Sequence, residues 1–149
     1  MKNRKNIHIE WGDCDPAQIV YFPRYFEYFD ACTTALFRKA GLVKSAMLKK
    51  YGIVGIPLVD VRATFHAPSR FDDDVVIESE FVEVRRSSFV VRHRLLNRGT
   101  AAVECIETHV WARRSGKNPG AIEGAPIPPE VAQKLAGKKM RTTSKKKER

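Results

Sequence analysis

The sequence of 149 residues lacks several features that identify large classes of proteins. Three cysteines, Cys14, Cys32 and Cys105, form no CxxC motif, and their odd number argues against a disulfide scaffold. The basic N-terminal stretch MKNRKNIHIEWG contains no apolar run of signal-peptide length, and no later run is long enough to span a bilayer. We therefore expect one cytoplasmic domain in a reducing compartment.

Common catalytic and cofactor motifs are also missing. There is no GxSxG elbow, no GxxxxGK[ST] phosphate loop and no GxGxxG after a strand. Four histidines, His8, His66, His93 and His109, have no HExxH or other metal-ligand spacing. We predict no metal and no cofactor.

The net charge of +10 is concentrated at the two ends of the chain. Residues 1–5 carry three bases, and residues 138–149, KKMRTTSKKKER, carry seven bases and one acid. The remaining 17 bases and 16 acids nearly cancel. We predict a folded domain at 1–137 and a disordered basic tail at 138–149. A tail that binds nucleic acid or an anionic surface is the alternative, because lysine runs attract phosphate.

Hydrophobic periodicity predicts an α+β fold. The run IHIEW (7–11) alternates as a strand does, whereas residues 23–40 carry apolar side chains at helical spacing and end before Gly41. A shorter helix at 44–51 ends before Gly52. Extended runs follow at 57–67, 74–84, 87–97 and 101–114, with a hairpin turn at 97–100 and a short final helix within 126–137.

One long helix beside about five strands predicts a curved antiparallel sheet wrapped around that helix. Two of the last strands are long, and long strands leave long edges that proteins cover or pair. We therefore expect pairing with a second copy of the chain.

The stretch WGDCDPAQIVYF (11–22) places Asp13 and Asp15 in a tight turn that leads into an apolar, aromatic run. An Asp in such a turn commonly accepts backbone N–H bonds, and this structural role is favoured for Asp13. For Asp15, the residues alone leave a structural and a catalytic role equally open. Asp30 lies within the long helix and faces either solvent or a pocket. Cys14 is better interpreted as a small buried thiol than as a nucleophile.

Three stretches carry a resemblance to a known family. They are WGDCDPAQIVYFPRYFEYFDA, GIVGIPLVDVRATFHAPSRFDDDVVIES and VRRSSFVVRHRLLNR, and the likeness covers roughly residues 7–112 in order. They resemble the 4-hydroxybenzoyl-coenzyme A thioesterase family, which has the hotdog fold. The resemblance implies hydrolysis of an acyl-CoA, with an aromatic acyl group, to the free acid and coenzyme A.

The resemblance also implies roles for individual residues. Asp15, just before the proline of GDCDPA, matches the family's catalytic carboxylate, and the backbone N–H of Phe22 matches the helix donor that polarises the thioester carbonyl. Asp30 matches the aspartate that meets the substrate's ring hydroxyl. Arg85 and Arg86, with Ser88 two residues further on, lie where the family binds coenzyme A.

Two positions depart from the family pattern and are expected to reshape the acyl pocket. Gln18 replaces a common glycine, and Ile56 stands where threonine is frequent. Tyr21 and Phe22 are expected as aromatic walls, whereas Phe26 and Phe29 are as well explained by the core.

Two other functions remain open at this stage. One is a hotdog hydratase or dehydratase, although no histidine lies between His8 and His66, where those relatives usually place one. The other is a non-catalytic acyl-CoA or nucleic-acid binding protein. In the family, two subunits join their sheets and share residues at each site, so we expect a dimer as the active unit and a tetramer as the assembly.

Overall fold

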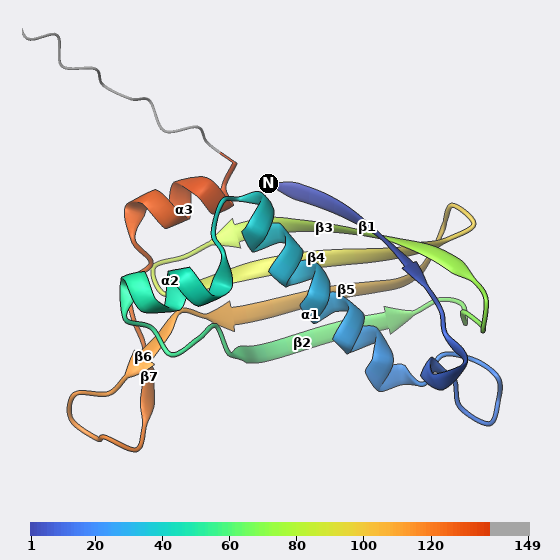
Figure 1. The fold of residues 1–149 in the computed structure, drawn as a ribbon, viewed down its shortest axis with the longest axis horizontal. Coiled ribbons are helices and arrows are strands. Elements are labelled where there is room, and N and C mark those ends of the chain that lie inside the picture. The colour runs from blue at the N-terminus through green and yellow to red at the C-terminus, as the bar shows by residue number, and fades with distance from the viewer. Residues whose placement is uncertain (138–149) are drawn as a thin grey trace, which may run out of the picture.

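The computed structural model describes residues 1–137, so the predicted tail at 138–149 lies outside the described residues. Five strands form one antiparallel sheet in the order β1-β3-β4-β5-β2, and helix α1 (Phe22–Lys39) lies across one face of it (Figure 1). The strands are β1 (Lys2–His8), β2 (Leu58–Phe65), β3 (Asp74–Val84), β4 (Ser88–Asn97) and β5 (Thr100–Val110). The predicted α+β architecture is confirmed.

The helices begin and end where local chemistry indicates. Pro23 lies in the first turn of α1, where its missing N–H costs no helical bond. Gly41, with φ of 78°, closes the end of that helix, and Gly52, with φ of 63°, closes α2 (Lys44–Tyr51). Helix α3 (Pro129–Leu135) follows the strands. Among residues 1–137, no helix combines the length and apolar character needed to cross a membrane.

Two strand predictions need correction. β1 lies at Lys2–His8 rather than at 7–11, because the chain turns after Ile9 into a short 3-10 helix, η1 (Trp11–Asp13). The run 101–114 divides at Trp111, whose N–H still bonds to Ser87 before β4 while its carbonyl accepts from Ala125. Beyond that point β4 offers no partner. The chain therefore continues as β6 (Ala112–Arg114), paired with the unpredicted β7 (Ile122–Gly124).

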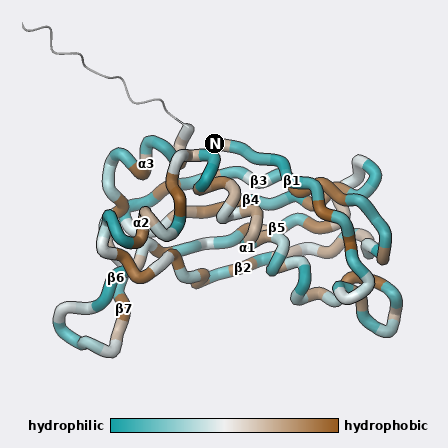
Figure 2. Tube along the Cα trace, viewed as in Figure 1, coloured by the Kyte–Doolittle hydropathy of each residue, from teal (hydrophilic) through white to brown (hydrophobic). Residues whose placement is uncertain are grey.

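The core lies between α1 and the sheet and has two clusters. One surrounds Phe37 and Trp111 and includes Leu135 of α3, and the other surrounds Phe29 and Ile77. Hydropathy changes repeatedly along β3, β4 and β5, as expected for strands with one buried face (Figure 2). The core thus anchors both ends of α1.

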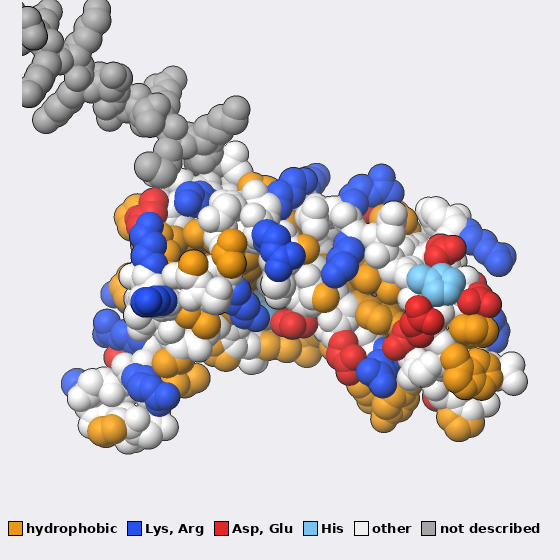
Figure 3. All heavy atoms as spheres, in the orientation of Figure 1, with side chains coloured by type: hydrophobic (Ala, Val, Ile, Leu, Met, Phe, Trp, Pro, Cys, Tyr) orange, Lys and Arg blue, Asp and Glu red, His pale blue; other side chains and the backbone are white. Residues whose placement is uncertain are grey.

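Strand β2 is an edge strand with exposed apolar side chains. Leu58, Val59, Val61 and Phe65 are each 41–59% exposed. Hydrophobic side chains gather along the lower edge of the molecule in Figure 3, where β2 and the start of α1 lie in Figure 1. A long edge of this kind is an interaction surface unless it is covered.

Candidate active site

Asp15 lies in a tight loop whose backbone bonds fix its direction. Its N–H donates to the Ile19 carbonyl at 2.9 Å, and its carbonyl accepts from the Gln18 N–H at 2.8 Å. One carboxylate oxygen, Oδ1, accepts the Ala17 N–H at 2.8 Å. This is the local turn that short acidic side chains favour. It orients the carboxylate, and among residues 1–137 the other oxygen has no hydrogen-bond donor.

Asp13 has a structural environment. Its Oδ2 accepts the Glu10 N–H at 3.0 Å, its Oδ1 lies 3.9 Å from the Arg24 guanidinium, and its carbonyl accepts the Tyr21 N–H at 2.8 Å. Burial, followed by the Asp13 carboxylate, raises the pKa of Tyr28 far above its usual value, so that phenol stays neutral. These contacts support the structural role expected for Asp13, because they tie the acidic turn to the start of α1.

Helix α1 begins directly after this turn. Its first residue, Phe22, has an N–H without an acceptor among residues 1–137, as the first amides of a helix do. The helix N-terminus also carries partial positive charge. Tyr21 and Phe22 are 49% and 59% exposed, and their rings meet edge to face at 5.5 Å between centroids. Both can therefore serve as aromatic walls, whereas Phe29 is fully buried in the core.

A cavity of about 500 Å³ opens beside Asp15 and Gln18. The sequence interpretation missed three of its lining residues: Trp11, Arg70 and Phe71. Trp11 and Phe71 meet edge to face at 5.5 Å, and Arg70 forms an isolated bridge with Ile19. These contacts join segments about 50 residues apart. The only signal for them in the sequence is the segment PSRFDD, which lies within the family resemblance.

Cys14 also lines this cavity, and its environment disfavours a thiolate. Burial raises the pKa of the Cys14 thiol, and the nearby Asp13 and Asp15 carboxylates raise it further. A thiol kept neutral is a poor nucleophile, which agrees with the preference for a thiol that is not a nucleophile. The side chain is partly buried, however, rather than buried as predicted.

Gln18 adopts a left-handed backbone conformation, with φ of 64°. Glycine is the residue best suited to this conformation, and the family commonly has glycine here. The Gln18 side chain is exposed at the cavity. This departure from the family pattern therefore combines local strain with a side chain placed beside Asp15.

Asp30 is exposed on α1 and lies outside the cavity beside Asp15. Its role toward a ring hydroxyl, which the family resemblance implies, stays a prediction.

The residues predicted to bind coenzyme A lie elsewhere. Arg85 donates from two nitrogens to both carboxylate oxygens of Glu83, each at 2.8 Å, and thereby lowers the Glu83 pKa. Arg86 is exposed and has no ion pair among residues 1–137. Ser88 is the first residue of β4, and its carbonyl accepts the Arg85 N–H at 2.8 Å. Of the two arginines, Arg86 is thus the one available to a phosphate.

The two halves of the predicted site lie at opposite ends of the sheet. Strand β4 begins at Ser88 and ends at Asn97, whose side chain donates to Ser69 at 3.1 Å. The Ser69 carbonyl accepts from Val20, next to the Asp15 loop, at 2.9 Å. Ten residues of strand extend roughly 30 Å. One chain therefore does not bring Asp15 and the Arg86 segment together, and Ile56, next to β6, lies at the Arg86 end.

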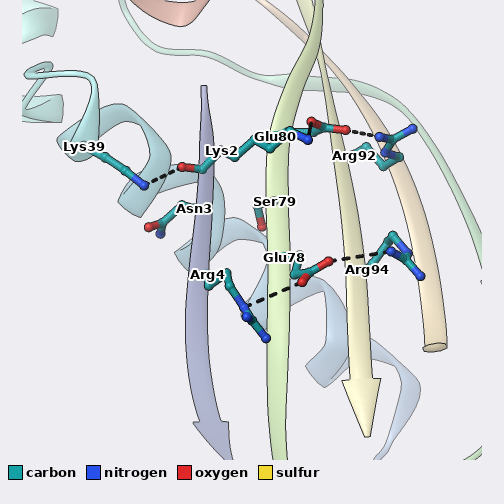
Figure 4. A pocket seen from close by; sticks show the side chains of 9 residues that line it. All are labelled: Lys2, Asn3, Arg4, Lys39, Glu78, Ser79, Glu80, Arg92 and Arg94. Atoms are coloured by element: carbon teal, nitrogen blue, oxygen red, sulfur yellow. Dashed lines mark hydrogen bonds and ion pairs between the residues drawn. The ribbon is translucent and has the colours of Figure 1, made fainter. Parts of the chain in front are cut away.

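A second hollow of about 550 Å³ lies over β1, β3 and β4. Its two acidic residues are paired: Glu78 is 3.6 Å from both Arg4 and Arg94, and Glu80 pairs with Arg92 (Figure 4). Lys39 instead donates to the Lys2 carbonyl at 2.6 Å. This hollow contains no predicted site residue. Among residues 1–137, no group of three His, Cys, Asp or Glu side chains is placed to hold a metal ion.

Comparisons with known proteins agree with this fold. The thioesterase-like superfamily matches residues 9–135. The 4-hydroxybenzoyl-CoA thioesterase of Pseudomonas sp. (strain CBS-3) is 39% identical over 123 residues, covering 77% of this chain and 86% of the relative.

Solved structures give the same result. A 4-hydroxybenzoyl-CoA thioesterase mutant in complex with 4-hydroxybenzoyl-CoA has a TM-score of 0.81 and 31% identity, covering 90% of this chain and 98% of that one. A gentisyl-coenzyme A thioesterase has a TM-score of 0.77 and 27% identity, covering 89% and 99%. The predicted family and hotdog fold are confirmed: the chain belongs to the thioesterase-like superfamily and is a thioester hydrolase.

Proposed function

We propose that this hydrolase cleaves an aromatic, 4-hydroxybenzoyl-like acyl-CoA, with Asp15 as its catalytic carboxylate. The observation that carries this proposal is the Asp15 loop. One carboxylate oxygen is held by the Ala17 N–H, the other has no donor among residues 1–137, and α1 begins a few residues later. The relatives named for 4-hydroxybenzoyl-CoA and gentisyl-coenzyme A support an aromatic acyl group.

The chemistry needs an anion stabiliser and a carboxylate. The N–H of Phe22, at the positive end of α1, donates to the thioester oxygen as negative charge develops there, and one such donor is worth about 2.7–4 kcal/mol. Asp15 either attacks the carbonyl carbon or removes a proton from attacking water. In the covalent route, the C–S bond breaks, coenzyme A leaves as the thiolate, and water hydrolyses the mixed anhydride to regenerate Asp15.

The acyl group would lie against the exposed Tyr21 and Phe22 rings, with Gln18 of the same chain and Ile56 of a second chain shaping its pocket. Asp30 would accept a hydrogen bond from a ring hydroxyl. Arg86, aided by Arg85 and Ser88, would bind the coenzyme A phosphates. Phosphate recognition of this kind relies on charge-assisted hydrogen bonds.

This assignment requires two chains at each site. A dimer with twofold symmetry that pairs two β2 strands antiparallel would reverse one sheet relative to the other. It would bring the Asp15 end of one chain to the Arg86 end of its partner. The exposed Val61 and Phe65 would then be covered. We propose this dimer as the smallest active unit and a dimer of dimers as the assembly.

A cytoplasmic location fits the cysteines. Cys14, Cys32 and Cys105 are free thiols, as a reducing compartment would keep them.

The substrate proposal is tested by measuring thiol release from a panel of acyl-CoAs that includes 4-hydroxybenzoyl, benzoyl and short aliphatic groups. We expect kcat/KM to be highest for hydroxylated aromatic acyl groups. Equal rates across the panel would refute the aromatic preference. Hydration of an enoyl-CoA without thiol release would indicate the hydratase alternative, and binding without turnover would indicate a non-catalytic protein.

Site sharing is tested by mixing Asp15→Asn and Arg86→Ala chains after reversible dissociation. A random mixture contains heterodimers with one intact site each, so activity at low substrate concentration should recover to roughly a quarter of wild type. Activity that never exceeds the average of the two parent variants would refute a shared site.

A further inference from the structure

Polar side chains are buried beneath α1, where the sheet otherwise presents apolar residues. His93 on β4 is 0% exposed, and Glu107 and His109 on β5 are 3% and 5% exposed. None of them lines the cavity beside Asp15. Buried ionisable groups are costly unless they are paired and hydrogen-bonded, so this network calls for an explanation of its own.

Hydrogen bonding specifies the protons of the pair formed by Glu107 and His109. His109 Nδ1 lies 2.9 Å from the carbonyl oxygen of Ile56, which can only accept, so Nδ1 carries a proton. His109 Nε2 lies 3.1 Å from Glu107 Oε2. Burial by itself raises the Glu107 pKa, but the hydrogen bonds from His109 and His93 outweigh it and lower that pKa to about 2. The second ring nitrogen, Nε2, therefore bonds to Glu107, and both ring nitrogens of His109 have partners.

His93 connects this pair to α1. Its Nε2 lies 3.3 Å from both Glu107 Oε2 and the Thr33 hydroxyl of α1. Its Nδ1 lies 2.7 Å from the Ser79 hydroxyl, which can donate to it. The ring stacks on Phe29 with 4.9 Å between centroids. Both ring nitrogens of His93 thus have partners within the buried network.

The other end of the network holds an irregular segment. The carbonyl of Gly55 accepts the Ala112 N–H at 3.1 Å, and that of Pro57 accepts the Val110 N–H at 3.0 Å. The carbonyl of Ile56, between them, has the His109 ring as its hydrogen-bond donor. Three consecutive carbonyls are therefore held by residues 109–112, two by backbone and one by a side chain.

We infer that His109 is a positioning residue: its ring, held by Glu107, donates from Nδ1 to the Ile56 carbonyl and so orients residues 55–57 at the Arg86 end of the sheet. The role of these residues toward substrate rests on the proposed function. The hydrogen-bonded clamp itself does not. Through Glu107, His93 and Thr33, the same network ties this segment to α1, which carries Phe22 at its start.

The first test needs no activity. In full-length protein labelled with nitrogen-15, we expect the His109 ring, identified by the loss of its signal in His109→Gln, to carry a hydrogen-bonded proton on Nδ1. Hydrogen exchange of the Val110 and Ala112 amides should accelerate roughly tenfold in His109→Gln, as loss of one hydrogen bond would allow. A His109 ring without a proton on Nδ1, or unchanged exchange at both amides, would overturn the clamp.

The second test is kinetic. His109→Gln should raise KM for acyl-CoA several-fold with kcat changed by less than about twofold. His66→Gln is the matched control, because His66 pairs with Glu104 at 2.9 Å on the exposed surface. If His109→Gln fails to fold, the double variant with Glu107→Gln replaces both members of the buried pair and takes its place in both tests. Faster exchange with unchanged KM would retain the clamp and reject the assigned role of residues 55–57.

Discussion

Replacing Asp15 by Asn separates its catalytic role from its structural one. The Asp15 carboxylate accepts the Ala17 N–H at 2.8 Å. The Asn amide keeps an oxygen that can accept the same N–H, so the turn retains its local hydrogen bond. Even complete loss of that bond would cost about 0.5–1.5 kcal/mol. In a domain of this size, about 1 kcal/mol corresponds to a Tm change of roughly 2–4 °C. We therefore expect a nearly unchanged Tm.

Activity should respond on a different scale. An amide neither forms a mixed anhydride nor accepts a proton from water, and proton transfer alone contributes about 10²–10⁴-fold to rate. We expect kcat for Asp15→Asn to fall by about three orders of magnitude or more, measured by thiol release, while circular dichroism gives the Tm. Turnover within tenfold of wild type in a folded Asp15→Asn protein would refute the catalytic assignment.

Asp13→Asn is the matched control, two residues away. Asp13 has a side chain only 18% exposed, and its carboxylate serves both the Glu10 N–H and the Arg24 guanidinium. Asn has a single, uncharged amide oxygen, so it cannot satisfy both contacts as the carboxylate does. We expect a Tm several degrees lower and a kcat close to wild type in the folded fraction. If Asp13→Asn lost kcat while Asp15→Asn lost mainly Tm, the catalytic role would belong to Asp13 and the structural role to Asp15.

Three further outcomes follow from the geometry. Arg86→Ala should raise KM for acyl-CoA about tenfold or more, and Arg85→Ala should raise it less, because Arg85 already pairs with a carboxylate. Neither substitution should change KM for a thioester that lacks the nucleotide. An equal rise in KM for both kinds of substrate would contradict phosphate binding. Gln18→Gly should leave Tm unchanged or slightly raised, whereas Gln18→Val should lower it by several degrees, because a β-branched residue fits a φ of 64° poorly. The same Tm for both variants would contradict strain at this position. Because hydrogen bonds from His109 lower the pKa of Glu107 from 4.5 to about 2, the stability that they provide is complete above about pH 4.5 and is lost as pH falls toward 2. The free energy of unfolding in urea should therefore fall more steeply with acid in wild type than in Glu107→Gln. The same pH dependence in both proteins would contradict an ionised Glu107.

Local signals in the sequence predicted most of the elements. Helix α2 ends at Gly52, which has a positive φ that glycine adopts easily. The turn at 97–100 contains Arg98 and Gly99, both with positive φ, between two paired strands. In both cases the deciding interaction lies within a few residues of chain. Periodicity and turn chemistry are sufficient there.

The cavity could not be predicted in the same way. Trp11 meets Phe71, and Ile19 bridges to Arg70, only after β1 and β3 pair. These contacts depend on strand order, which a pattern along one strand does not contain. The separation of Asp15 from Arg86 has the same origin, because the family resemblance aligns residues without showing which of them share a chain at one site.

The buried network shows a further limit of sequence patterns. In the run ECIETHV (104–110), polar residues occupy both alternating sets, so a period of two does not reveal which face is buried. In the structure, Cys105, Glu107 and His109 face α1, whereas Glu104 is exposed. Burial of Glu107 is possible because two histidines on the same face supply its donors, and that arrangement arises from the register of β4 and β5.

The clamp and the proposed dimer meet at one point in the chain. Leu58, the first residue of β2, pairs with His109, and the register shifts between Leu58 and Asp60. The His109 ring that holds the Ile56 carbonyl therefore acts two residues before the edge strand begins. A clamp at this place fixes where β2 starts, and with it which of its exposed apolar side chains face a second copy. The buried pair of Glu107 and His109 would thus order both the Arg86 end of the sheet and the edge through which a partner completes the site.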